Sequence, residues 1–164
     1  MKHRILAICL SLVFTTAFGQ INADKNRQVV LQRNRIGKTY IFDRSKKGHY
    51  NRTELTYLGK LKTNDKRVFK ILISIAFRGN SPKAMSRILL FNNKNQYVGN
   101  YYVGMPYDLP GKIENNALVF NSKDRIDCDS AIVTRIPFNN GMPKQFVLPC
   151  KNNKAEEYSF SDKE

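Results

Sequence analysis

Large apolar side chains at every second position between Lys66 and Arg78 constrain the fold of this chain more than any other feature. The five that share one face of an extended segment are Phe69, Ile71, Ile73, Ile75 and Phe77. Successive side chains of a β-strand point to opposite faces, whereas an α-helix would distribute these positions around its axis. The segment therefore predicts a β-strand with one apolar face.

Two hairpins are predicted around this strand. Residues 54–62 alternate in the same way, and a polar turn at 63–65 joins the two runs. Residues 87–91 and 96–103 form a second pair across another polar turn. Its return strand is expected to place four residues on one side: Tyr97, Gly99, Tyr101 and Val103.

Shorter apolar runs separated by Asn, Gly, Ser and Pro continue this strand-and-turn pattern. They predict further strands at residues 28–32, 38–43, 112–115, 117–121, 131–136 and 144–148. No stretch of ten or more residues shows helical periodicity with caps. The expected fold is all-β, one antiparallel β-sandwich of about eight to ten short strands over residues 27–150, with a β-barrel as the alternative. A flexible charged tail is expected at 151–164.

The N-terminus has the three-part layout of a cleavable secretory signal at residues 1–19. A positive start precedes an apolar stretch at 5–18, and Gly19 is a small residue before the expected cut. This stretch of about 14 residues is shorter than the ~20 that cross a bilayer, so a retained membrane anchor is disfavoured. We therefore expect an exported protein, periplasmic or secreted, that starts with a polar leader at 20–26.

The mature chain is strongly cationic. Removing residues 1–19 takes Lys2 and Arg4 from the 28 basic residues and none of the 13 acidic ones, which leaves a net charge of +13. Such a charge favours an anionic glycan, a lipid head group or an acidic protein as partner, and export ranks intracellular nucleic acid below these. The alternative is that Lys and Arg only solvate outward faces and keep strand edges from pairing with other chains.

Export also changes how the cysteines are interpreted. Cys9 is lost with the signal, which leaves Cys128 and Cys150 as an even pair in an oxidising compartment. We predict that they form a disulfide, which would contribute ~3 kcal/mol on the chain-entropy model. The alternative is two buried free thiols.

Catalytic signatures are sparse. The mature chain keeps one histidine, His49, which could act as a general base with Glu54 and a neighbouring Arg44 or Arg52, as in a small nuclease. A lone His in a loop rich in Gly and Lys is more often simply solvated. Phosphate-binding Gly loops and nucleophile elbows are absent, so no cofactor is predicted.

Metal and modification signals are equally weak. Three acidic residues that could share a calcium ion lack the Gly and terminal Glu of a calcium loop, so no metal site is predicted: Asp124, Asp127 and Asp129. Ser130 lies in an Asp-Ser-Ala sequence typical of periplasmic O-glycosylation, and Asn51 starts an N-glycosylation sequon.

An aromatic and cationic cluster is the candidate ligand site. Its members are Arg87, Tyr97, Tyr101, Tyr102 and Tyr107. Exposed tyrosines beside an arginine could stack on sugars or bases. The alternative is that they form cross-strand pairs that stabilise the sheet.

The stretch from Arg87 to Pro110, RILLFNNKNQYVGNYYVGMPYDLP, resembles small exported proteins of Gram-negative bacteria that lack an assigned activity. The resemblance implies a periplasmic or secreted setting and no catalytic residues. Export, charge and interleaved tyrosines favour a non-enzymatic envelope or secreted domain that binds an anionic or carbohydrate ligand. A small hydrolase that uses His49 and an inhibitor or immunity-like protein are the alternatives.

Overall fold

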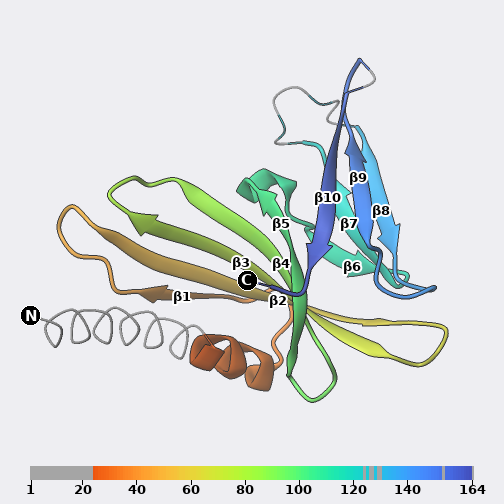
Figure 1. Cartoon of the computed structure of the whole chain (residues 1–164), viewed down its shortest axis with the longest axis horizontal. Coiled ribbons are helices and arrows are strands. Elements are labelled where there is room, and N and C mark those ends of the chain that lie inside the picture. The colour runs from red at the N-terminus through yellow and green to blue at the C-terminus, as the bar shows by residue number, and fades with distance from the viewer. Residues whose placement is uncertain (1–23, 124, 126–127, 129–130, 153, 164) are drawn as a thin grey trace, which may run out of the picture.

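The computed structural model describes residues 24–163, apart from 124, 126–127, 129–130 and 153. A helix covers residues 24–33 and precedes the strands (Figure 1). The other elements are β1 Thr39–Asp43, β2 Tyr50–Lys62, β3 Val68–Gly79, β4 Ala84–Phe91, β5 Tyr97–Gly104, η1 Pro106–Asp108, β6 Lys112–Glu114, β7 Ala117–Asn121, β8 Val133–Pro137, β9 Gln145–Pro149 and β10 Ala155–Ser161. The predicted signal segment 1–19 lies outside the described residues.

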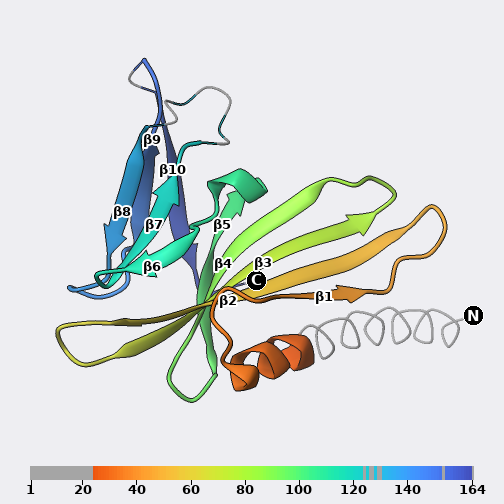
Figure 2. The same ribbon diagram turned by 180° about the vertical axis from the view of Figure 1, so that it is seen from behind.

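The strands form two antiparallel sheets. The larger sheet has the order β1-β2-β3-β4-β5-β10-β9, and the smaller has the order β6-β7-β8. The ends of β1–β4 that are joined by the β1–β2 and β3–β4 loops extend away from the smaller sheet. We call this part the arm; Figures 1 and 2 show it from opposite sides. The two sheets do not close into a barrel, so the predicted all-β sandwich is confirmed.

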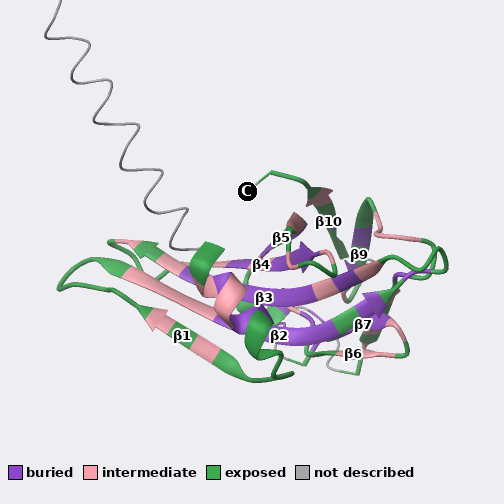
Figure 3. Cartoon of the chain, turned by 90° about the horizontal axis from the view of Figure 1, so that it is seen from below, coloured by how far each residue is buried: buried purple, intermediate pink, exposed green. Residues whose placement is uncertain are grey.

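Two apolar clusters cover opposite faces of the large sheet. Alternate residues of β3 divide between them: Ile71 and Ile73 face the main core between the sheets, and Leu72 faces the helix. Val30 and Leu31 of the helix pack on the second cluster, and the helix lies over β2 and β3 (Figure 3). The central strands are therefore buried on both sides.

Within the described part of the chain, no helix has the length and apolar character needed to cross a membrane.

The helix lies where the sequence predicted a polar leader and a β-strand. The leader at 20–26 and the strand at 28–32 were expected, but residues 24–33 are helical, and residues 20–23 lie outside the described region. The local signal is weak because only three consecutive residues here, Val29 to Leu31, are apolar, and so short a run does not separate helix from strand. Packing against the sheet decides the conformation.

The predicted tail at 151–164 is also wrong in its main part. Residues Ala155–Ser161 form β10, which pairs with β9 and with the end of β5. Tyr158 is buried in the main core, and Phe160 packs against it. The two aromatic residues alternate as a strand requires, but the partner of Phe160 is Tyr101 of β5, about 60 residues earlier, which a local pattern does not reveal.

Tyr97 does not share a face with Tyr101 as predicted, because β5 contains a bulge between them. The register shifts between the pairs Leu90–Gly99 and Phe91–Tyr97, so one extra residue, Val98, enters the strand. Tyr101 faces the main core, whereas Tyr97 packs against the cluster under the helix. An inserted residue reverses the side-chain alternation beyond it.

Gly99 permits the close approach of β10, and we expect Gly99→Ala to destabilise the fold. A Cβ atom at this position would lie 2.5 Å from the Ser161 carbonyl oxygen and closer still to the Phe160 ring. Overpacking of this kind costs about 1–3 kcal/mol. Urea unfolding should show this loss, whereas Gly111→Ala, whose Cβ would lie 3.9 Å from Asn121 Nδ2, should have little effect. Equal stability of the two variants would contradict the assigned contact.

Candidate functional site

His49 does not form the catalytic pair considered for a hydrolase. Its side chain is exposed, and Nδ1 lies 3.3 Å from Asn80 Oδ1, a contact that joins the β1–β2 loop to the β3–β4 loop. Glu54 lies on β2 in an ion pair of 2.6 Å with Arg52 Nη2. Among the described residues His49 has no carboxylate partner, so the considered pair of His49 and Glu54 is not formed.

The predicted tyrosine cluster is divided between several environments. Tyr101 is fully buried and its hydroxyl donates to the Pro143 carbonyl oxygen at 2.5 Å. Tyr97 is half-buried under the helix, and Tyr107 is exposed on η1. Tyr102 is 51% exposed, and the Arg87 guanidinium carbon lies 5.3 Å from its ring centroid. Of the five candidate ligand-binding residues, the structure therefore brings together Arg87 and Tyr102.

The positive charge is concentrated in the first part of the fold. Residues 24–94, which form the helix and β1–β4, contain 18 Lys and Arg against 4 Asp and Glu, a net charge of +14. Residues 95–164 contain 8 Lys and Arg against 9 Asp and Glu, a net charge of −1. The helix and the strands of the arm thus account for the cationic character of the whole domain.

One side of the large sheet collects cations on strands β2, β3 and β4. We call the side on which the helix packs the helix-side face. Strand register places five basic residues there: Lys60, Lys62, Lys70, Arg78 and Arg87. Strands β1–β5 contribute no Asp or Glu to this face, because Asp43 and Glu54 point to the opposite side, where Arg52 is their neighbour.

Two of these cations, Lys70 and Arg78, make contacts with uncharged groups that leave their charge unpaired. Arg78 Nη1 donates to Asn51 Oδ1 and Nη2 donates to Thr53 Oγ1, each at 2.9 Å. Burial, followed by the nearby charge of Arg27, lowers the pKa of Arg78. Burial and the charge of its cross-strand neighbour Lys60 lower the pKa of Lys70. Each cation would be stabilised by a nearby anion.

Sequence reasoning missed this face although the signal was present. The alternation that places Phe69, Ile71 and Ile73 of β3 in the main core also places Lys70 and Arg78 together on the other side. The sequence of β3 alone does not show which side of the sheet the helix and the neighbouring strands leave accessible.

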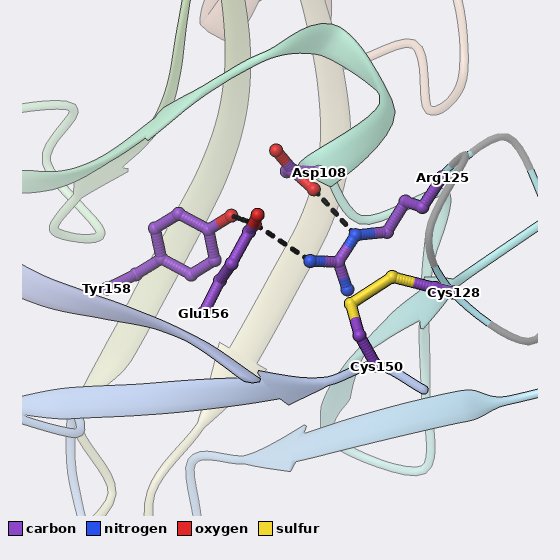
Figure 4. Close-up of a disulfide and its surroundings, with 6 residues drawn as sticks. All are labelled: Asp108, Arg125, Cys128, Cys150, Glu156 and Tyr158. Carbon is purple, nitrogen blue, oxygen red and sulfur yellow. Dashed lines mark hydrogen bonds and ion pairs between the residues drawn. A yellow bond between two sulfur atoms is a disulfide. The ribbon is translucent and has the colours of Figure 1, made fainter. Parts of the chain in front are cut away.

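In a second group of charged residues, the side chains pair with one another and connect elements of the fold. The buried Arg125 Nε lies 2.8 Å from Asp108 Oδ1, an ion pair without hydrogen-bond alignment, and Arg125 Nη2 donates to Glu156 Oε2 at 2.8 Å. The Tyr158 hydroxyl donates to the same Glu156 oxygen at 2.5 Å. Figure 4 shows these groups beside the Cys128–Cys150 disulfide. The network ties η1, the segment after β7 and β10 together.

The predicted disulfide is confirmed, with the two Cα atoms 4.4 Å apart. It fits an oxidising environment outside the cytoplasm. The candidate calcium and glycosylation residues Asp124, Asp127, Asp129 and Ser130 lie outside the described residues. The described residues contain no group of three or more His, Cys, Asp or Glu side chains that could hold a metal ion.

A cavity of about 430 Å³ opens elsewhere on the surface, lined by Asn64 and by residues 137 and 139–143. Its lining has no charged side chain, so acid–base chemistry has no obvious group there.

Fold and surface together define an all-β sandwich with one cationic sheet face. Comparisons with protein families, with curated proteins and with solved structures found no match to this chain. The resemblance to small exported bacterial proteins therefore stays a prediction.

Replacing Cys128 and Cys150 by serine should lower the free energy of unfolding by ~3 kcal/mol, because the unfolded chain regains the entropy that the cross-link removes. Urea unfolding of the double variant and of the reduced wild type measures this loss. Identical midpoints for the oxidised and reduced wild type would contradict a stabilising bridge.

As the pH falls, the wild type should gain stability relative to a variant that lacks the Asp108 carboxyl group. Burial, and then the charge of Glu156, raises the pKa of this carboxyl above its ordinary value of 3.8. The folded state therefore binds a proton more readily than the unfolded state, and stability rises as the pH drops through the raised pKa. Urea unfolding from about pH 7 to about pH 4 should show the wild type gaining on Asp108→Asn.

Asp65 is the control of opposite sign. Hydrogen bonding from Thr63 lowers the pKa of this exposed carboxyl, so the wild type should lose stability relative to Asp65→Asn as the pH falls below about 4.5. The same trend for both pairs would contradict the assignment of Asp108.

Proposed function

We propose that this protein is an exported, non-enzymatic binding protein that attaches to an anionic polymer outside the cytoplasm through its helix-side face. The observation that carries the proposal is the charge pattern of that face, five Lys and Arg with no Asp or Glu from β1–β5. A surface of one sign attracts and concentrates polyanions.

Edge protection does not account for three of these cations. Basic residues that keep sheets from pairing with other chains are expected on edge strands. Lys70, Arg78 and Arg87 lie instead on β3 and β4, which are interior strands of the seven-stranded sheet. Placing charges there costs stability, because burial, followed by the charge of Lys60, lowers the pKa of Lys70. Retaining them is understandable if they meet an anionic ligand.

The distribution of the charges favours an extended ligand over a small one. Lys70, Ser74 and Arg78 lie four residues apart along β3, and Arg87 pairs with Ser74. At about 3.3 Å per residue, successive cationic positions are about 13 Å apart along the strands. A polymer with repeated acidic groups can contact several of them at once.

Binding should be sensitive to salt and to charge on the helix-side face. We expect the exported protein to bind polygalacturonate and inorganic polyphosphate at low salt and to release both at high salt, measured by calorimetry. Changing Lys60, Lys62 and Lys70 to Gln should weaken binding at least tenfold and lower the slope of log K against log salt by about 2.

The matched control removes the same charge from the second half of the chain. Lys144, Lys151 and Lys154 are exposed and lie outside the helix and β1–β4. Changing them to Gln should reduce affinity much less. If the two triple variants bind equally well, the helix-side face is not the binding surface; if neither polymer binds the wild type, the proposed function is wrong.

A further inference from the structure

The helix divides the helix-side face into two areas. Its residues Val30 and Leu31 pack on the cluster that contains Leu72 and Leu89. Lys60, Lys62 and Lys70 lie on one side of this row, and Arg78 and Arg87 lie on the other, toward the end of the arm. The area toward the end of the arm also holds Tyr102, the cross-strand partner of Arg87.

This area combines an accessible ring with positioned guanidinium groups. Tyr102 is 51% exposed, with Arg87 over its ring at 5.3 Å. Arg78 is fixed by Asn51 and Thr53, each at 2.9 Å. Helix residue Arg27 is close enough for its charge to affect Arg78. Fixed side chains lose little conformational entropy when a ligand binds.

From this geometry we propose that Arg87 and Tyr102 form a subsite for an acidic saccharide unit, with the anionic group at Arg87 and the apolar face of the sugar ring on Tyr102, and that Arg78 contacts the anionic group of a neighbouring unit. The inference rests on the proposed function and specifies its ligand class. An aromatic ring has an apolar face that can pack against the C–H groups of a sugar, and a guanidinium group donates paired hydrogen bonds to a carboxylate or phosphate.

A lipid bilayer fits this area less well. Peripheral binding to a bilayer uses apolar side chains that insert beside the basic ones. The exposed aliphatic side chains of this region lie on the opposite side of the large sheet, which we call the sandwich side because it faces the main core. Ile41 pairs with Glu54 on the sandwich side, and Ile36 lies near Gly59 on that side. On the helix-side face of β1–β5, Tyr102 is the exposed large apolar residue among those described.

Two polyanions that differ in the presence of sugar rings test the inference. The exported protein and its variants would be titrated with oligogalacturonate and with inorganic polyphosphate of similar charge. Tyr102→Val keeps a strand-forming residue but removes the ring, and should weaken oligogalacturonate binding roughly fivefold while leaving polyphosphate binding unchanged. Tyr102→Phe should restore binding, and Arg78→Gln should weaken binding of both polymers.

Tyr50→Val is the matched control, because Tyr50 is 39% exposed on β2 and points to the sandwich side. It should bind both polymers as the wild type does, and thermal unfolding should confirm that both Val variants are folded. If Tyr102→Val binds oligogalacturonate as tightly as the wild type, the saccharide subsite is wrong while the proposed polyanion binding stands. If the wild type binds neither polymer, the proposed function itself has failed.

Discussion

Burial of both faces of β2, β3 and β4 is the constraint on which the other parts of the structure depend. Ile71 and Leu72 of β3 are consecutive, point to opposite faces and are both fully buried. A sheet with two apolar faces needs a covering layer on each side. The small sheet with β9 and β10 covers one face, and the helix covers the middle of the other. The disulfide and the Arg125 network then hold η1, β10 and the segment after β7 beside the first layer.

The parts of the fold that could be predicted from sequence are those determined by local pattern. Alternation in β3 and polar turn residues beside it identify the first hairpins, because a strand and its turn are both encoded within a few residues. The helix and β10 could not be predicted with the same rules. Each has two or three apolar residues, and each is held by partners distant in the chain, such as Leu55 and Leu89 for the helix.

The candidate site shows the same difference between local and long-range information. Pairing of Cys128 with Cys150 could be predicted because only two cysteines follow the predicted signal segment. The tyrosine cluster was predicted as one surface, but the bulge at Val98 and the burial of Tyr101 separate its members. Arg87 and Tyr102 stay together because they are cross-strand partners, a relation that the predicted hairpin already contained.

The unequal charge of the two halves connects the fold to its proposed function. The covering layers β6–β10 are close to neutral, so their attachment to the large sheet meets little net repulsion, while the helix and β1–β4 hold a net charge of +14. Like charges gathered on one face destabilise a folded domain and attract counterions. The helix-side face retains this charge on interior strands, beside an exposed tyrosine and positioned arginines. A polyanion would remove the repulsion and gain the aromatic contact, and thus stabilise the face that the fold leaves least balanced.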